Sequence, residues 1–375
     1  MKKLITAALL LALSTPSLAL PVPDPPNVDA SSFVLMDFAT GQILASREPH
    51  KRIEPASITK VMTSYIAFAE IRNGQIALED TVLVSENAWR KKGSSMFLQV
   101  GTKVTVEELL KGIIIQSGND ASIAMAEYLA GGEETFAALM NQYAQRLGMT
   151  NSHFTNATGW PDENHYTTAY DIALLSHALI RDFPDFYKLY KQRKYTYNNI
   201  PQYNRNKLLS RDESVDGIKT GHTESAGYCL AASAVRDDRR LISVLLGASD
   251  EDARADGSMA LMNYGFRFFE TVPLYSANEE VSSVRAWKSE QGEVKLGLAS
   301  DLVVSIPRGE RRNLDIQPSI DQRIIAPVRQ GQVLGLLEIR HNGEVIRSEP
   351  LIALETIEKG GLIRQLIDEI RLRMQ

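Results

Sequence analysis

The chain of 375 residues contains a single cysteine, Cys229, which excludes an internal disulfide. Its six histidines show no spacing typical of metal ligands, so neither a metal nor another cofactor is expected. The formal net charge of −5 makes nucleic acid an unsuitable partner. The apolar run at residues 4–13 is too short to span a bilayer as a mature helix. With 44% hydrophobic and 23% charged residues, the sequence is typical of a globular protein that is stabilised by its core.

The N-terminus has the pattern of a secretory signal peptide. Two lysines precede the apolar run 4–13, and Ser17-Leu18-Ala19 supplies the small residues that signal peptidase requires. We therefore expect residues 1–19 to be removed and the mature chain to begin at Leu20. An exported protein whose one cysteine lies in an apolar run, typical of a buried strand, fits a bacterial periplasm or cell surface.

The rest of the chain predicts an α/β fold, in the α+β sense, with a second domain. Residues 20–272 mix strand and helix signals, and three successive strands between 215 and 248 indicate a central antiparallel sheet flanked by helices. Within them, residues 183–211 show little periodicity and predict a long surface connection. Residues 273–357 contain short β-rich runs, including a hairpin with Asn342-Gly343 at its turn, and predict a small all-β, sandwich-like domain.

Residues 358–375 predict a terminal amphipathic helix. Its apolar positions are Leu362, Ile363, Leu366, Ile367, Ile370 and Met374. Such a face either lies in a membrane surface or packs on the protein itself, and the sequence leaves both interpretations open.

The stretch Ser57-Ile58-Thr59-Lys60, ahead of an apolar helical run, carries the main chemical signal. Residues three apart on a helix lie on the same face, so the Lys60 amine can take the hydroxyl proton of Ser57. A lysine base must be neutral, which requires burial or a second cation to lower its pKa from the ordinary value of about 10.4. The alternative is a serine that only caps a helix.

Two further motifs follow along the chain. Ser117-Gly118-Asn119 lies between two predicted helices, and Lys219-Thr220-Gly221 ends a predicted strand. Taken alone, each has a simpler interpretation: Asn119 or Asp120 caps the next helix, and Lys219 is a solvated charge on a strand edge.

The three motifs together, at positions 57, 117 and 219 of an exported chain, resemble the motif set of the penicillin-recognising serine enzymes. The closer resemblance is to the low-molecular-mass penicillin-binding proteins that are D-alanyl-D-alanine carboxypeptidases. Stretches at 156–161, 165–168, 219–223 and 265–269 resemble that subfamily too, so the resemblance covers essentially the whole mature chain. Tyr170 departs from the arginine that the family often has there, without touching the motifs.

This resemblance implies a serine peptidase that removes the terminal D-alanine from peptidoglycan stem pentapeptides through an acyl-serine intermediate, and that penicillins acylate. Ser57 is then the nucleophile, Lys60 its base, and Ser117 the relay that protonates the leaving D-alanine. Lys219 adds a second cation that helps to lower the pKa of Lys60. The backbone N–H groups of Ser57 and His222 form the implied oxyanion hole.

The substrate-binding residues implied by the resemblance are Asn119, Lys219, Thr220, Gly221, His222 and Arg254. Among them, Asn119 is expected to bind the peptide backbone of the substrate. Thr220, supported by Arg254, is expected to bind its terminal carboxylate.

Two other functions stay open: a serine β-lactamase on the same fold, and a non-catalytic wall-binding protein. Gly118, where many class A β-lactamases have aspartate, and the extra β-domain argue against a lactamase. The expected location is the periplasm, with the terminal helix attached peripherally to the outer face of the inner membrane.

Overall fold

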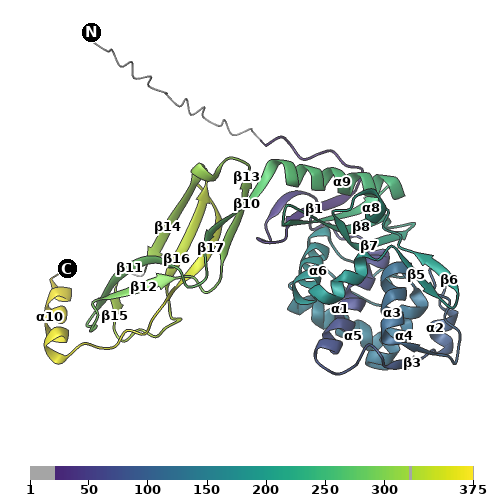
Figure 1. The fold of residues 1–375 in the computed structure, drawn as a ribbon, viewed down its shortest axis with the longest axis horizontal. Helices are drawn as coiled ribbons and strands as arrows, with labels where there is room; N and C mark the ends of the chain where they lie inside the picture. Colours follow the sequence, from purple (N-terminus) through teal and green to yellow (C-terminus); the bar gives the residue numbers. More distant parts are fainter. Residues whose placement is uncertain (1–21, 321–322, 375) are drawn as a thin grey trace, which may run out of the picture. The chain divides into compact units, whose positions relative to one another are not determined.

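The computed structural model describes residues 22–320 and 323–374. The predicted signal peptide, residues 1–19, and the predicted mature start at Leu20 lie outside the described residues. The described chain divides into a first unit, Asp24–Pro273 with Val303–Ser305, and a β unit, Leu274–Leu302 with the residues from Ile306 onward. Figure 1 shows the elements of each unit.

A five-stranded antiparallel sheet with the order β2-β1-β9-β8-β7 forms the centre of the first unit. Its strands are β1 (Ser32–Asp37), β2 (Ile43–Arg47), β7 (Val215–Thr223), β8 (Gly227–Arg236) and β9 (Arg239–Ala248). Helix α9 (Glu251–Phe268) covers one face, and α6 (Ala169–Asp182) covers the other (Figure 1). Because both faces are covered, the middle strands are apolar and buried nearly throughout. The predicted central antiparallel sheet is confirmed.

Most of the elements between β2 and α6 along the chain are helices, joined by one short strand pair. They are α1 (Lys60–Arg72), β3 (Thr81–Leu83), α2 (Glu86–Arg90), β4 (Lys103–Thr105), α3 (Val106–Lys111), the π-helical turn η2 (Gly112–Gln116), α4 (Asn119–Ala130) and α5 (Glu133–Arg146). Thr105 begins α3 with a capping box, because its side chain accepts the N–H of Glu108 while the Glu108 carboxylate accepts the N–H of Thr105.

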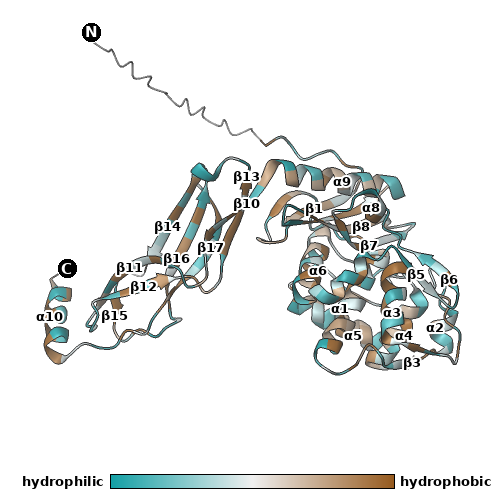
Figure 2. Ribbon diagram, in the orientation of Figure 1, coloured by the Kyte–Doolittle hydropathy of each residue, from teal (hydrophilic) through white to brown (hydrophobic). Residues whose placement is uncertain are grey.

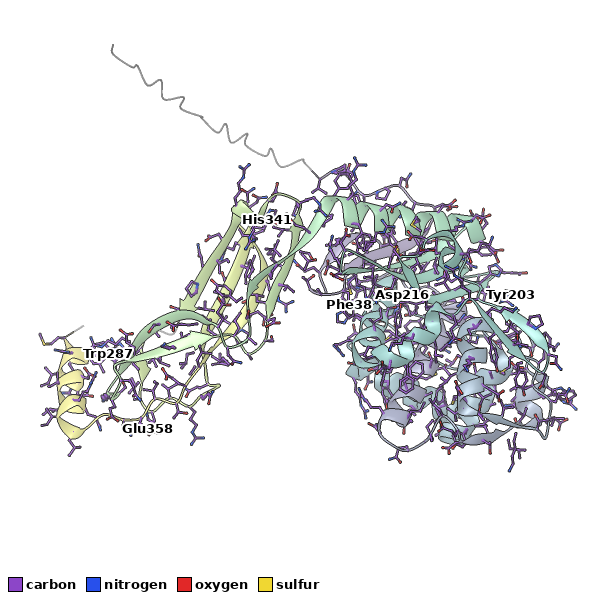
Figure 3. The ribbon with its side chains drawn as sticks, in the orientation of Figure 1. Phe38, Tyr203, Asp216, Trp287, His341 and Glu358 are labelled. Carbon is purple, nitrogen blue, oxygen red and sulfur yellow. The ribbon has the colours of Figure 1, made fainter. Side chains whose placement is uncertain are left out.

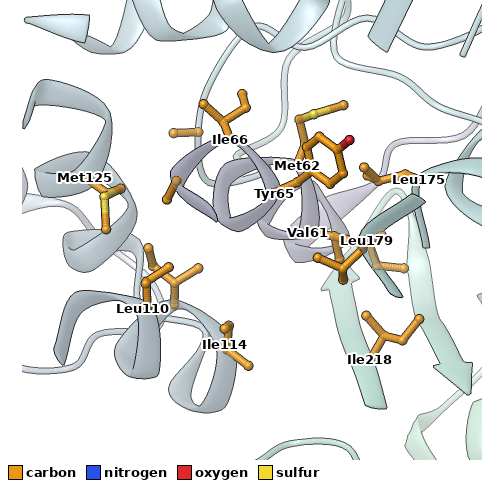
Figure 4. Close-up of a cluster of buried hydrophobic side chains, with 14 of the residues drawn as sticks. Val61, Met62, Tyr65, Ile66, Leu110, Ile114, Met125, Leu175, Leu179 and Ile218 are labelled. Carbon is orange, nitrogen blue, oxygen red and sulfur yellow. The ribbon is translucent and has the colours of Figure 1, made fainter. Parts of the chain in front are cut away.

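Helix α1 is the centre of the hydrophobic core, and every residue from Lys60 to Ala69 is buried. Figure 4 shows α1 between two groups of apolar side chains, Leu110, Ile114 and Met125 on one side and Leu175, Leu179 and Ile218 on the other. Each apolar side chain buried in this way contributes about 1.5–3 kcal/mol. The packing therefore fixes the start of α1, which carries Lys60.

The prediction of a long surface connection at residues 183–211 is confirmed only in part: most of these residues are exposed, but they form regular elements. This stretch forms α7 (Pro184–Tyr187), η3 (Lys188–Lys191), β5 (Lys194–Tyr197), β6 (Ile200–Tyr203) and α8 (Leu208–Arg211). Tyr190 is fully buried, and its hydroxyl lies 2.5 Å from Ser64 Oγ. Elements of four residues are too short to produce a hydrophobic period, which is why the pattern showed none.

The β unit contains a six-stranded sheet with the order β14-β16-β17-β12-β11-β15. Its strands are β11 (Glu280–Trp287), β12 (Glu293–Gly297), β14 (Leu314–Ile320), β15 (Ile324–Ile325), β16 (Val333–His341) and β17 (Glu344–Ala353). A separate pair joins β10 (Phe269–Tyr275) to β13 (Leu302–Pro307); residues 269–273 and 303–305 of these strands belong to the first unit. In the β unit, η4 (Arg311–Asn313) precedes β14. Asn342-Gly343, both at positive φ, form the turn of the predicted hairpin, which is confirmed.

Helix α10 (Leu362–Arg373) packs on the β unit through its polar side. The Asp368 carboxylate accepts the backbone N–H of Lys288 at 2.8 Å and Nη2 of Arg285 at 3.0 Å. The same Arg285 guanidinium lies 3.6 Å from the ring centroid of Trp287, which is labelled near α10 in Figure 3. The helix does pack on its own protein, but with the face opposite to the one the sequence suggested.

The apolar face of α10 is consequently exposed. Leu362 is 84% exposed, Ile363 79% and Leu366 63%, and Figure 2 shows apolar and polar residues on this one short helix. In the described part of the chain, no helix combines the length and the apolar character that crossing a membrane requires.

Candidate active site

Ser57 lies in a 3₁₀ turn, η1 (Ala56–Thr59), directly before α1. Because a 3₁₀ helix has three residues per turn, side chains three apart are aligned, and Lys60 Nζ lies 3.0 Å from Ser57 Oγ. The N-cap residues of η1 and α1 are Pro55 and Thr59, and neither makes a capping bond with its side chain. The interpretation of Ser57 as a capping serine is therefore wrong.

Lys60 is 1% exposed, and besides Ser57 its amine contacts two oxygen atoms that accept hydrogen bonds. Asn119 Oδ1 lies 2.7 Å from Nζ, and the carbonyl oxygen of Thr158 lies 2.6 Å from it. Both oxygens only accept hydrogen bonds, so a neutral amine gives them its two hydrogens and points its lone pair at the Ser57 hydroxyl. Burial favours this neutral form and lowers the pKa of Lys60 to about 7.

A loop to which the sequence analysis gave no role holds the Thr158 carbonyl in place. Asn156 Oδ1 accepts the backbone N–H groups of Thr158, Gly159 and Trp160 at 3.1, 2.8 and 3.0 Å. Gly159 has a φ of +82°, and a Cβ at this position would lie 1.7 Å from the carbonyl oxygen of Ala56. Only glycine allows this close approach of the loop to η1.

His165 contacts η1 through the side chain of Thr59. Its Nδ1 accepts the backbone N–H of Thr155 at 3.1 Å, so the proton is assigned to Nε2, which lies 2.8 Å from Thr59 Oγ1. Burial lowers the pKa of His165 to about 4, and the ring is neutral at physiological pH. A neutral imidazole suits this structural position, because a charged one would add a second desolvated cation near Lys60.

Ser117 and Asn119 lie at the junction of η2 and α4. Ser117 has a φ of 66°, a left-handed conformation that is uncommon for a residue other than glycine, and its Oγ accepts a hydrogen bond from Lys219 Nζ at 2.9 Å. Asn119 Nδ2 donates to the carbonyl oxygen of Lys92 at 2.7 Å. The N-cap residue of α4 is Gly118, so the interpretation of Asn119 as a cap is wrong.

The neighbouring carboxylate, Asp120, is structural. It is 1% exposed and accepts the Ser95 hydroxyl at 2.6 Å and the backbone N–H groups of Met96, Leu98 and Ala121 at 3.0, 3.1 and 2.9 Å. These bonds fix the chain between α2 and β4 beside the site.

Strand β7 is the edge of the sheet that faces η1, and it carries the second lysine. Lys219 is 3% exposed, so the interpretation of a solvated charge is wrong. Burial lowers the pKa of Lys219 well below its usual range, and the Lys60 charge acts in the same direction. Gly221 brings β7 close to η1, since a Cβ there would lie 2.9 Å from the carbonyl oxygen of Pro55 and 3.2 Å from Ala56 Cβ.

A cavity of about 200 Å³ lies at this junction. Its lining residues are Ser57, Ser94, Ser117, Arg205, Thr220, Gly221, His222, Tyr228, Glu251 and Arg254. Arg254, in the first turn of α9, donates from Nη1 to the carbonyl oxygen of Gly221 at 3.0 Å. With Arg205 it gives the cavity two guanidinium groups, which suit a carboxylate.

The structure thus brings the predicted site residues together. Six of them line the cavity, while Lys60, Asn119 and Lys219 are buried and joined to it by hydrogen bonds. Their individual roles stay predictions. Sequence reasoning missed Ser94 and Arg205, and it missed Arg205 because the residue lies in the stretch that was interpreted as a surface connection.

Neither the Cys229 thiol nor a metal-binding group offers an alternative chemistry among the described residues. Cys229 is fully buried, as predicted, and burial raises the pKa of its thiol to about 11, so it is no nucleophile at neutral pH. Within residues 22–320 and 323–374, no three His, Cys, Asp or Glu side chains form a metal-binding group. A serine with an adjacent neutral amine and a cationic cavity is suited to acyl transfer from a substrate that ends in a carboxylate.

Comparison with known proteins agrees with this chemistry. Residues 21–250 match the peptidase family described as D-alanyl-D-alanine carboxypeptidase. Residues 269–359 match the domain described as the penicillin-binding protein 5 C-terminal domain. The chain is 43% identical over 356 residues to the D-alanyl-D-alanine carboxypeptidase DacC of Escherichia coli K12, across 93% of this chain and 89% of the relative.

Solved structures are similar as well. Penicillin-binding protein 5 from Haemophilus influenzae superposes with a TM-score of 0.87 at 38% identity, covering 90% of this chain and 100% of that one. Penicillin-binding protein D2 from Listeria monocytogenes, in an ampicillin-bound form, has a TM-score of 0.60 at 26% identity, covering 64% of this chain and 100% of that one. The predicted fold, mixed α/β with a C-terminal all-β domain, is confirmed.

Proposed function

The chain belongs to the D-alanyl-D-alanine carboxypeptidase family of penicillin-binding serine peptidases, and on this premise we propose that Ser57 is its nucleophile and Lys60 its base. The observation that carries this proposal is the 3.0 Å contact between the Ser57 hydroxyl and a buried amine whose pKa is about 7. Burying a lysine is costly, and the cost is retained where chemistry needs a neutral amine. A non-catalytic wall-binding protein has no such need.

In the acylation step, Lys60 takes the proton of Ser57 Oγ, and this oxygen attacks the carbonyl carbon between the two D-alanines. The backbone N–H groups of Ser57 and His222 stabilise the resulting oxyanion, each typically by about 3 kcal/mol. The C–N bond then breaks as Ser117 gives its proton to the leaving amine. Ser117 recovers the proton that Lys60 took, and Lys219 keeps its hydroxyl oriented.

Residues on the two sides of Ser57 orient the substrate. Thr220 and Arg254 bind the terminal carboxylate in the cationic cavity, and Asn119 binds the peptide backbone on the acyl side. After D-alanine leaves, a water molecule takes its place and hydrolyses the ester, which restores Ser57. A penicillin keeps its leaving group tethered, so water is obstructed and the acyl-enzyme accumulates.

The test measures both reactions on one preparation. We expect a labelled penicillin to add its mass to the protein and to leave slowly, over many minutes, while a D-Ala-D-Ala peptide turns over with release of D-alanine. Rapid penicillin turnover with no adduct and no D-alanine release would identify a β-lactamase instead. The one carboxylate in the described cavity lining, Glu251, pairs with Lys207 at 3.1 Å and lies 3.8 Å from Arg254, so we assign the activation of water to Lys60, which a tethered leaving group obstructs.

We further propose that the protein acts in the periplasm and attaches to the outer face of the inner membrane through α10. Its packing supports this, because the polar face binds the β unit through Asp368 while Leu362, Ile363 and Leu366 are exposed. An exposed apolar stripe on a helix is suited to the interfacial region of a bilayer.

A further inference from the structure

A second cavity, of about 240 Å³, is not used by the steps above. It is lined by Asn87, Arg90, Lys91, Lys92 and Trp160. Three of these side chains are cationic, and Trp160, which is 45% exposed, adds an aromatic surface. None of these residues lines the first cavity.

This cavity adjoins the acyl side of the proposed site. Asn119 Nδ2 donates to the carbonyl oxygen of Lys92 at 2.7 Å. At Gly93, a Cβ would lie 2.6 Å from Asn119 Nδ2 and 3.4 Å from Trp160 Cζ3, so both side chains border the same point of the chain. Trp160 also follows closely after Thr158, whose carbonyl oxygen binds Lys60. The Lys91 charge is near enough to contribute to the lowered pKa of Lys60.

The charges in this cavity are only partly balanced. Arg90 pairs with Glu86 on an exposed helix turn, and Lys91 Nζ lies 3.4 Å from Glu133 Oε2. Lys92 is exposed and has no carboxylate within ion-pair distance among residues 22–320 and 323–374. The cavity therefore keeps a positive charge that favours an anionic ligand.

The course of the substrate identifies this ligand. Its terminal carboxylate is expected at Arg254, in the first cavity, so the acyl part of the peptide continues past Ser57 and Asn119 in the other direction. We propose that the second cavity binds a free carboxylate on the acyl side of the stem peptide, with Lys92 as its counter-ion and Trp160 packed against the adjacent apolar atoms. This inference rests on the proposed function and adds a specificity site to it.

Two matched peptides test the proposal. Nα,Nε-diacetyl-L-Lys-D-Ala-D-Ala is neutral in its side chain, whereas the Nα-acetyl-Nε-succinyl peptide carries a carboxylate at the same position. We expect kcat/KM for the succinyl peptide to exceed that for the diacetyl peptide by about tenfold, mainly through a lower KM, since a charge-assisted hydrogen bond has about that effect. High salt should reduce this preference.

Variants assign the preference to Lys92. In Lys92→Gln the ratio of the two kcat/KM values should fall to within about twofold, and in Lys92→Arg it should persist, because the charge is kept. Lys103→Gln, an exposed lysine on β4 outside both cavities, is the control and should keep the full ratio. Equal rates for the two peptides in the unmodified protein, or an unchanged ratio in Lys92→Gln, would overturn the specificity site alone. Failure to hydrolyse either peptide would instead contradict the proposed function.

Discussion

The two units depart from the usual distribution of side chains in opposite ways. The first unit buries charged groups, among them Lys60, Lys219 and Arg254, each less than 5% exposed. In the described part of the β unit, Asp368 is the one buried charged residue, and α10 exposes its apolar face. Folded proteins normally avoid both arrangements, because a desolvated charge and an apolar surface in water each cost free energy.

This difference separates two kinds of function. A buried amine is useful only where its lowered pKa does chemistry, and an exposed apolar face is useful only where something covers it. The first unit is therefore the place to test catalysis, and the β unit is the place to test attachment. Substituting a buried charged group of the first unit should leave membrane attachment intact, and substituting the exposed apolar residues of α10 should leave catalysis intact.

The largest effect is expected from Ser57→Ala. The variant should fold, because the Ser57 side chain is partly exposed to the cavity, yet lose D-alanine release by at least about a thousandfold and lose covalent penicillin labelling altogether. Intact mass and thermal unfolding measure the two properties separately. Ser210→Ala, at an exposed position of α8, is the control and should retain both activities. A penicillin adduct on the Ser57→Ala protein would remove Ser57 as the nucleophile.

The second-largest effect is expected from Gly159→Ala. This variant tests whether the loop around Gly159 holds the buried amine of Lys60 in position. Gly159→Ala forces a Cβ into the carbonyl oxygen of Ala56, and we expect a loss of at least about 2–3 kcal/mol in the free energy of unfolding, with slower penicillin acylation. Gly131→Ala is a matched control, because Gly131 has a similar φ of +77° with nothing within 4 Å of a Cβ. It should lose only about 1 kcal/mol. Equal losses in both variants would mean that the contact with Ala56 is unimportant.

The third effect concerns pH. The folded pKa of Lys60 is lowered to about 7, so the amine is charged and inactive below this pH and neutral above it. The penicillin acylation rate should rise about tenfold per pH unit up to pH 7 and level off above, measured by stopped-flow or quenched labelling. Because unfolded lysine titrates near 10.4, the same shift predicts that stability rises with pH between about 7 and 10. An acylation rate that begins to rise only near pH 10 would show that Lys60 is not desolvated.

Part of the site and part of the fold could be predicted from the sequence because their signals are local. The spacing of Ser57 and Lys60 and the turn at Asn342-Gly343 depend on neighbouring residues, and the structure contains both arrangements. Local rules describe such features without knowledge of the whole fold.

The remainder depends on packing between distant segments, which no local pattern records. The start of α9 is an example: the large apolar residues of this helix begin only at Met259, but the helix itself begins at Glu251 with Asp250 as its cap, and this places Arg254 in the cavity. Gly257 weakened the pattern, yet a Cβ there would lie 2.7 Å from Leu245 Cδ1, so the glycine allows close packing on β9. The same holds for α10, whose orientation depends on Asp368 rather than on its apolar periodicity.

The smallest effect is expected at α10, where it tests whether the exposed apolar face of the β unit attaches the protein to a membrane. Deleting residues 358–375 should release the protein from vesicles of anionic phospholipid while leaving carboxypeptidase activity largely unchanged, because no residue of this segment lines the first cavity. The double variant Leu366→Gln with Ile370→Gln should weaken sedimentation with vesicles in the same direction, since both side chains are more than half exposed, at 63% and 53%. One short apolar stripe gives only weak, reversible binding, so the difference will be a few-fold in the bound fraction.

The control is Val333→Gln with Val345→Gln, which removes exposed apolar groups from β16 and β17 instead, at 55% and 48% exposure, and should leave binding unchanged. If the strand variant releases the protein as well as the helix variant does, the attachment depends on general surface hydrophobicity, and α10 has no special part in it.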